Sequence, residues 1–348
     1  MKKGFALVMA SMMALSLTAC GGNGSSATTA ADTSAADTKA EGTTAAAPAD
    51  KIGLAGSGKE LIFTTGGDQG TYYGFGSVLA GQISDMTDTT VTAIVGKGSK
   101  GNIEAMDAGD AQLGFVQSDV MAYAYNGTNL FDGAKVDGFS TVAALYMEQV
   151  QIVTLNPDIK TVADLKGKTV SVGDSGSGVY FNALDCLGAY GLTIDDITPT
   201  YQSFGDSVEA MQDGKIDAAF IVAGAPTTAV TSLAATRKVY LVELDDEHID
   251  KLIEASPYYS KYTIAKDAYG LDADATTVAV GAVVVARDDA DENDIYNVVA
   301  GIYDSIDTLG HDKKNELDLD FAASVTAVPY HAGAAKYFAE KGLTVPTK

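Results

Sequence analysis

The chain has 348 residues, of which 46% are hydrophobic and 20% charged, so it can bury the core of one large or two medium domains. Its formal net charge is −23, with 23 Lys and Arg against 46 Asp and Glu, which argues against a nucleic-acid ligand because phosphates require a basic surface. Arginine occurs only at Arg237 and Arg287, so a bidentate arginine clamp on a carboxylate can come from these two alone.

The N-terminal 19 residues have the pattern of a signal peptide. Two lysines precede the apolar run 5–17, which is too short to span a bilayer. The run ends in the letters LTAC, which resemble the lipobox of bacterial lipoproteins and imply lipidation of Cys20; a plain signal peptide with an incidental cysteine is the alternative. Residues 20–58 follow as an expected flexible linker, because 21–50 are mostly Gly, Ala, Ser, Thr and Asp with no aromatic residue. The expected location is extracytoplasmic, with a lipid anchor in the membrane.

The first predicted element of the folded part is a strand at residues 60–65, which is short, apolar and rich in β-branched side chains. A small polar loop at 66–73 follows, and apolar residues then recur at helical spacing up to Met86. The first backbone N–H groups of such a helix face the loop and favour an anion even without a cationic side chain. We interpret this stretch as one half of an anion-binding cleft.

A helix, a glycine and an apolar strand occur twice in the chain. The letters IEAM at 103–106 return as VEAM at 208–211, each followed by a glycine and an apolar run. The same offset carries the loop 70–73 onto 175–178. The repetition predicts two α/β lobes that face each other.

Long apolar stretches indicate how the lobes are connected. Residues 141–155 are expected to carry the chain from the first lobe to the second, and 277–286 form a buried return strand before a helix at 289–309. The predicted organisation is a signal peptide at 1–19, a linker at 20–58, lobe 1 at 59–152, lobe 2 at 153–274, and a return to lobe 1 at 275–348.

Loop hydroxyls beside helix starts occur in both lobes, at Thr71, Ser99, Ser175 and Ser177. Each can either cap its own helix or contact a ligand, and their repetition favours the ligand. Of Tyr72 and Tyr73, we expect one to point into the core and one into the cleft.

An extracellular serine hydrolase built on Ser175 is the alternative from another functional class. The segment GDSGSG at 173–178 superficially resembles the nucleophile segment of trypsin-like proteases. His248, His311 and His331 all follow Ser175, whereas the histidine of that family precedes its serine, and this order opposes the hydrolase. The histidines are also far apart in sequence, so neither a zinc site nor any cofactor is expected.

Several segments in order resemble the TAXI-type solute-binding subunit of TRAP (tripartite ATP-independent periplasmic) transporters. The resemblance runs from about residue 61 to 343 and rests on GTYY at 70–73, Gly98-Ser99 with Asn102, QSD at 117–119, DLKGK at 164–168, SGSG at 175–178, GAP at 224–226 and PYHAGA at 329–334. Gly74 departs from the pattern, where the family often has proline.

The resemblance implies a two-lobe α/β fold of the periplasmic-binding-protein type (type II-like) that closes over a small carboxylate, such as a glutamate-like amino acid, a dicarboxylate or a keto acid. It also implies delivery to the membrane subunits of an ion-gradient-driven TRAP permease, with the binding protein a monomer and not an enzyme. The ligand-binding residues that it implies are Gly70, Thr71, Tyr72, Tyr73, Ser99, Asn102, Gln117, Asp119, Ser175, Ser177, Gly178, Gly224 and Pro226. The second hypothesis is a sensor protein of the same fold that presents its ligand to a membrane receptor.

Overall fold

The computed structural model describes residues 51–348. The expected signal peptide, the lipidation of Cys20 and the linker up to residue 50 lie outside the described residues. Among the described helices, none is both long and apolar enough to cross a membrane.

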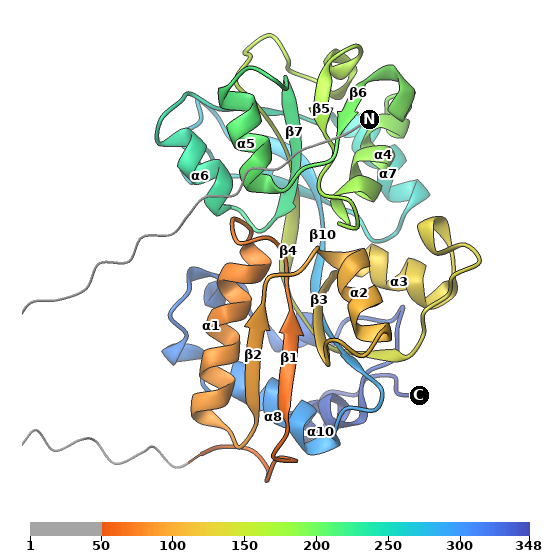
Figure 1. The fold of residues 1–348 in the computed structure, drawn as a ribbon, viewed down its shortest axis with the longest axis vertical. Coiled ribbons are helices and arrows are strands. Elements are labelled where there is room, and N and C mark those ends of the chain that lie inside the picture. The colour runs from red at the N-terminus through yellow and green to blue at the C-terminus, as the bar shows by residue number, and fades with distance from the viewer. Residues whose placement is uncertain (1–50) are drawn as a thin grey trace, which may run out of the picture. The chain divides into compact units, whose positions relative to one another are not determined.

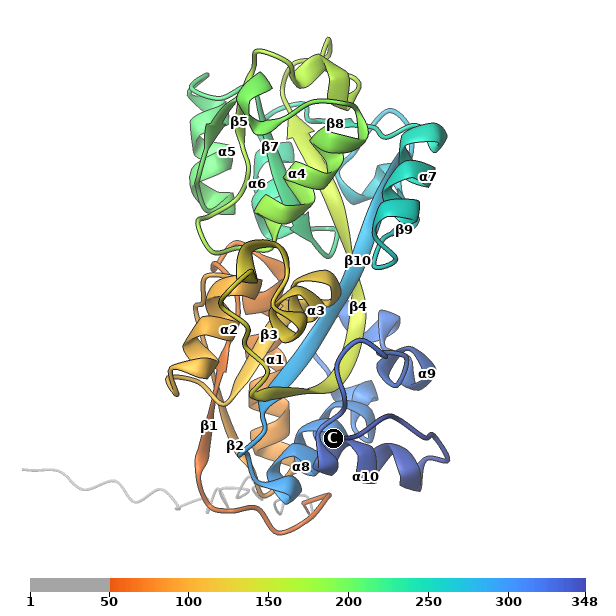
Figure 2. The same cartoon turned by 90° about the vertical axis from the view of Figure 1, so that its right-hand side faces the viewer.

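All the strands belong to one 10-stranded sheet that runs through two lobes (Figures 1 and 2). The strands are β1 (Glu60–Thr64), β2 (Thr90–Ile94), β3 (Leu113–Gln117), β4 (Phe139–Thr154), β5 (Thr169–Ser171), β6 (Thr198–Thr200), β7 (Ala218–Ala223), β8 (Tyr240–Val242), β9 (Ser260–Ile264) and β10 (Ala275–Arg287). Their order is β2-β1-β3-β10-β4-β7-β5-β6, with β8 beside β4 and β9 beside β10. The expected α/β fold with two lobes is confirmed.

The two long strands β4 and β10 join the lobes (Figure 2). They pair antiparallel, from Phe139 opposite Arg287 to Gln149 opposite Ala279. The far end of β4 then pairs with β7 in lobe 2, whereas the far end of β10 pairs with β3 in lobe 1. Helices cover both faces of these strands, which is why nearly every residue of both strands is buried instead of every second one. The expected crossing and return segments, 141–155 and 277–286, correspond to β4 and β10.

Lobe 1 has helices on both faces of its strands. Its helices are α1 (Thr71–Met86), α2 (Ser99–Asp107), α3 (Ser118–Asn126), α8 (Glu292–Tyr303), α9 (Leu319–Ala322) and α10 (Ala332–Glu340). Helices α1, α8 and α10 share one hydrophobic core with the strands, and α2 and α3 share another on the opposite face. The C-terminal helices α8, α9 and α10 thus pack with lobe 1.

Lobe 2 repeats this layering. Its helices are α4 (Val179–Ala189), α5 (Phe204–Gln212), α6 (Thr228–Ala234) and α7 (Asp246–Ala255). Helices α4 and α7 lie on one core, α5 and α6 on the other. Cys186 on α4 is a buried free thiol, and burial raises its pKa.

The internal repeat corresponds to a real structural repeat. Helix α2 leads through Gly109 into β3, and α5 leads through Gly214 into β7. Both glycines have positive φ, 86° and 69°, the left-handed conformation that commonly ends a helix. The second match is less regular, because α1 starts at Thr71 whereas α4 starts at Val179, after a turn formed by the loop serines.

Residues 52–57 differ from the expectation of a free linker. Ile52 forms a bridge with Thr87, and the backbone N–H groups of Leu54 and Ser57 donate to Asn297 Oδ1 and Asp294 Oδ1 on α8. The two partners on α8 lie more than 200 residues away in the sequence, so composition alone gave no sign of them.

Candidate functional site

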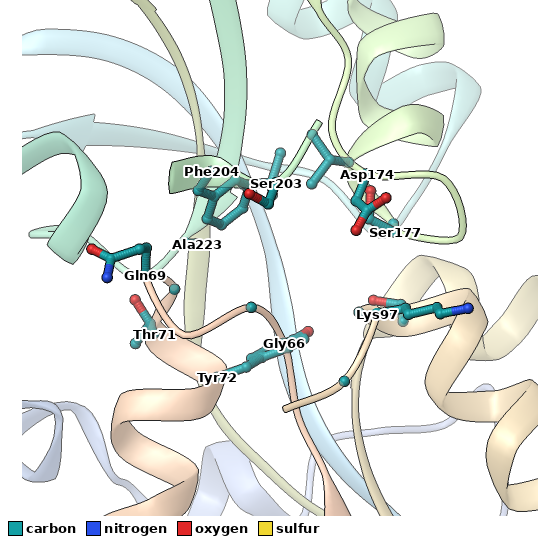
Figure 3. Close-up of a pocket in the computed structure, with 18 of the residues that line it drawn as sticks. Gly66, Gln69, Thr71, Tyr72, Lys97, Asp174, Ser177, Ser203, Phe204 and Ala223 are labelled. Atoms are coloured by element: carbon teal, nitrogen blue, oxygen red, sulfur yellow. The ribbon is translucent and has the colours of Figure 1, made fainter. Parts of the chain in front are cut away.

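A pocket that is partly open to solvent lies between the lobes. Lobe 1 contributes the loop after β1, the loop after β2 and the N-terminal starts of α1 and α2. Lobe 2 contributes the loop after β5 and the start of α5 (Figure 3). The floor includes Glu148 of β4, near the point where the chain crosses between lobes. A cleft lined by both lobes is a common place for a small-molecule site.

Three helices begin at glycines that line this pocket. Gly70, Gly98 and Gly178 are the N-caps of α1, α2 and α4, and none of the three helices has a side-chain cap. By contrast, α5, α7, α8 and α10 are capped by their own Ser203, Asp245, Asp291 and His331 side chains. Apart from the Gly101 N–H on α2, which donates to the Gly176 carbonyl, the first N–H groups of α1, α2 and α4 can therefore face a ligand, and their helix dipoles favour a negative one.

Side-chain hydroxyls and one amide add polar groups to these helix starts. Ser177 Oγ and Gln117 Oε1 are buried and have no hydrogen-bond partner among the described residues. Ser99 Oγ accepts from the Gln117 N–H at 3.0 Å. Thr71 Oγ1 donates across the cleft to the Gly224 carbonyl at 2.8 Å. The unpartnered groups can pair with a bound molecule, because buried polar atoms seldom remain unpaired.

A buried carboxyl group forms part of the pocket floor. Glu148 is 2% exposed, and its Oε2 accepts a 2.6 Å hydrogen bond from the Tyr72 hydroxyl. Burial raises the pKa of Glu148 to about 8, with the Tyr72 hydrogen bond acting in the opposite direction. Tyr72 stacks on Phe115 at 4.6 Å, and burial also keeps the Tyr72 pKa well above its ordinary value, so its hydroxyl remains a donor.

The rim carries charges of both signs. Lys97, Asp68 and Asp174 line the pocket and are exposed. Neither arginine lines it, since Arg287 pairs with Asp289 and Arg237 is on the surface. No arginine clamp is therefore part of this pocket.

The structure brings about half of the sequence-predicted binding residues together. Those that line the pocket are Gly70, Thr71, Tyr72, Ser99, Gln117, Ser177 and Gly178. Tyr73, Asn102, Asp119, Ser175, Gly224 and Pro226 do not line it.

Each of these six residues has a definite place near the pocket. Asn102 is fully buried and its amide donates to the Thr65 and Phe115 carbonyls, which fixes the loop after β1. Ser175 lies in a second, outer groove with Tyr180 and Tyr201. Gly224 and Pro226 form the loop that receives Thr71, and Tyr73 is half-buried on α1.

Asp119 is buried behind the pocket. Its Oδ2 accepts from Asn182 Nδ2 on α4 at 3.1 Å, and Oδ1 has no partner among the described residues. Burial raises the Asp119 pKa to about 7.

Sequence reasoning did not find Glu148, Lys97 or Phe204. Glu148 carried a usable signal, since it is the only charged residue of the apolar strand β4. Lys97 and Phe204 stand beside helix starts like many other residues, and no feature of the sequence distinguished them.

The lobes are in direct contact around the pocket. Gly101 N–H donates to the Gly176 carbonyl at 2.9 Å, and Ala229 N–H donates to the Gln69 carbonyl at 3.1 Å. Gln117 Nε2 donates to Asn182 Oδ1 at 3.0 Å. The structure is therefore a closed arrangement of the two lobes.

The three histidines are engaged elsewhere. His248 stacks on Tyr190 at 3.6 Å, His311 packs on Phe75 at 5.0 Å, and His331 caps α10. None of them lines the pocket or the outer groove that contains Ser175. Within residues 51–348, no cluster of three or more metal-ligating side chains occurs.

Comparison with known proteins gives one family and several relatives. The model of the NMT1-like family matches residues 63–342. A putative aliphatic sulfonates-binding protein of Escherichia coli (strain K12) is 43% identical over 70 residues, a match that covers 20% of this chain and only 22% of that protein.

Solved structures of binding proteins also match. The alkanesulfonate-binding protein SsuA from Xanthomonas axonopodis pv. citri, bound to MOPS, is 18% identical with a TM-score of 0.47, over 80% of this chain and 83% of that one. PhnD1 from Prochlorococcus marinus (MIT 9301), in complex with methylphosphonate, is 13% identical with a TM-score of 0.47, over 76% and 89%.

Proposed function

This chain belongs to the NMT1-like family, and from that premise we propose that it is an extracytoplasmic solute-binding protein that captures a small anion, in the first place a carboxylate, between its lobes. The observation that carries the proposal is the convergence of three uncapped, glycine-started helices on one pocket. Such N-termini supply N–H donors and a positive partial charge to an anion.

The overall charge of the protein makes local donors necessary. A net charge of −23 repels anions at long range, but salt screens this repulsion beyond about 8 Å at physiological ionic strength. Inside the cleft, the three helix starts and Ser177 line the pocket, where a bound anion can reach them. Affinity for an anion is therefore expected to come from short-range hydrogen bonds rather than from long-range attraction.

The transport partner follows from the motif resemblance. The loop motifs shared with TAXI-type proteins support delivery of the solute to an ion-gradient-driven TRAP permease. The lipobox-like letters LTAC at 17–20 support a lipid anchor on Cys20. The sulfonates-binding relative supports an anionic ligand of a different chemical class. A receptor-linked sensor remains the second candidate, and a neighbouring gene for a permease or for a histidine kinase distinguishes the two.

A thermal-shift screen of the purified protein tests the ligand class. The panel contains glutamate, dicarboxylates, keto acids, alkanesulfonates, phosphonates, phosphate and sugars. A ligand that binds only the folded protein raises its melting temperature by mass action. We expect a rise with a carboxylate. We expect Ser177→Ala to weaken its binding about tenfold, because the variant lacks the buried hydroxyl that would donate a hydrogen bond to the ligand.

Ser260→Ala is the matched control, because Ser260 is exposed on β9, far from the pocket lining. A rise with sugars but with no anion would contradict the proposal. A rise with sulfonates alone would support an anionic ligand but would show that the ligand is a sulfonate and not a carboxylate. Labelling by a covalent serine probe that is lost in Ser175→Ala would instead revive the hydrolase.

A further inference from the structure

Glu148 places a carboxyl group on the floor of a pocket whose other polar groups favour an anion. It is the only charged residue of β4 and is 2% exposed. In the same pocket, three helix N-termini present donors. An ionised carboxylate at this position would oppose the ligand that the rest of the pocket favours.

Glu148 has no cation of its own. Its one hydrogen bond within residues 51–348 is the bond that Oε2 accepts from Tyr72, and none of the ion pairs of these residues includes it. Lys313 acts on it only at longer range, because Lys313 Nζ contacts Glu316 Oε1 at 2.5 Å and the Ala225 carbonyl at 2.9 Å. A buried carboxylate without a paired cation is costly, and protonation removes that cost.

The other titratable groups around Glu148 do not reverse its preference for the protonated form. Tyr72 on α1 and Tyr146 on β4 are both neutral, since burial raises the pKa of each well above its ordinary value. Asp119 at the start of α3 raises the Glu148 pKa, whereas Lys313 lowers it, and burial is the largest influence. With a pKa of about 8, Glu148 is mostly protonated at neutral pH.

We propose that Glu148 is a specificity-determining residue that meets the anionic group of the ligand as a neutral acid, donating its own proton, so that capture of an anion requires one proton on Glu148. The inference rests on the proposed function. Glu148 lines the pocket, and its Oε1 makes no hydrogen bond to the described residues, so a proton on this carboxyl group is not taken up by another side chain. A ligand with an ammonium group at this point would reverse the dependence, because it would prefer the ionised form.

Isothermal titration with amine-free probes from pH 6 to pH 9.5 tests the proposal. The probes are 2-oxoglutarate and ethanesulfonate, bound to the full chain as wild type, Glu148→Gln and Asp119→Asn. For wild type we expect the Kd to rise by about tenfold per pH unit above about pH 8, as linkage to a single proton requires. For Glu148→Gln we expect a Kd that does not change over this range, because the amide donates without titrating.

Asp119→Asn serves as the control for a second buried acid. Asp119 also has a raised pKa but does not line the pocket, so the pH slope should survive its substitution. A slope that disappears in Asp119→Asn and survives in Glu148→Gln overturns the assignment to Glu148, and so does a flat wild-type profile or a slope of opposite sign.

A ligand-free measurement separates this inference from the proposed function. The ¹³C shift of the Glu148 carboxyl, assigned by its loss in Glu148→Gln, should titrate far above the ordinary value of 4.5. A midpoint near 4.5 overturns the inference even if anions bind. If no anion in the screen binds, the proposed function fails and this inference fails with it, whereas anion binding with a pH-independent Kd removes the inference alone.

Discussion

At the scale of single residues, the absence of a side chain at Gly178 allows the lobes to meet. A Cβ atom at this position would lie 1.7 Å from Gln117 Oε1 and 2.9 Å from Ser99 Oγ, both in the opposite lobe. Its own backbone is in the ordinary helical region, with φ −71° and ψ −20°, so alanine is sterically excluded only by its neighbours. Gly98 also lies close to the opposite lobe, since a Cβ atom added there would be 3.3 Å from the Cα of Ser177.

Gly178→Ala should therefore weaken ligand binding by at least about tenfold, since overpacking by one methyl group costs roughly 1–3 kcal/mol. The added methyl group must displace Gln117, which breaks the hydrogen bond between Gln117 and Asn182 that joins the lobes. Calorimetric Kd values give the test. Gly188→Ala on the same helix is the control, because a Cβ atom there meets nothing within 4 Å; equal loss in both variants would show that the effect is not the contact between lobes.

At the scale of elements, α1 places the first donor group, and its buried face holds it against the sheet. Phe75, Leu79 and Ile83 recur at helical spacing and are 0–1% exposed. These side chains pack in the core shared with α8 and α10, segments from the far end of the chain. The position of the binding loop thus depends on apolar contacts well away from it.

Leu79→Ala should lower the free energy of unfolding by roughly 3 kcal/mol, because it removes a buried side chain and leaves a cavity. Denaturant titration measures this change, and ligand-saturated protein should keep its binding stoichiometry. Ser77→Ala, on the exposed face of the same helix, should change stability by less than about 0.5 kcal/mol. A similar loss in both variants would contradict the role assigned to the buried face.

The sequence pattern was sufficient for elements whose signal is local. The helix ending at Met86, the crossing strand β4 and the two helix–glycine–strand units are each visible in hydrophobic spacing and glycine position. The site loops were found for the same reason, because glycines and hydroxyls cluster at strand ends.

Features that depend on distant partners could not be read in this way. The hydrogen bonds of residues 52–57 to α8 join opposite ends of the chain. Glu148 is conspicuous as the only charged residue of β4, but only the meeting of both lobes places it in the pocket. The late start of α4 depends on the turn at Ser175–Ser177, which hydrophobic spacing does not describe.

At the scale of the whole molecule, a C-terminal side chain reaches from lobe 1 to lobe 2. Lys313 lies in the turn Asp312–Glu316, is 4% exposed, and donates from Nζ to the Ala225 carbonyl at 2.9 Å. The same Nζ lies 5.3 Å from the centre of the Tyr146 ring. This contact stabilises the closed arrangement without contacting the pocket.

Lys313→Met should shift the ligand-free protein toward an open arrangement, because loss of a charged hydrogen bond removes about 1.5–3 kcal/mol from the closed side. Small-angle scattering should give a larger radius of gyration, restored when ligand saturates the protein. The neighbouring Lys314 donates to the Asp307 carbonyl, so Lys314→Met is the control and should leave the radius unchanged. An unchanged radius in Lys313→Met would contradict the bridging role.

The paired strands β4 and β10 have a consequence for the way in which the cleft opens. They cross between the lobes as a hydrogen-bonded ribbon, and the pairing shifts register between Ala282 and Val283 and again between Val284 and Val285. A ribbon of this kind accommodates rotation by changing its twist, so the lobes can separate without exposing the backbone of a melted linker. Cleft opening should therefore be nearly insensitive to low concentrations of urea, and the amide protons of both strands should exchange slowly whether the lobes are open or closed.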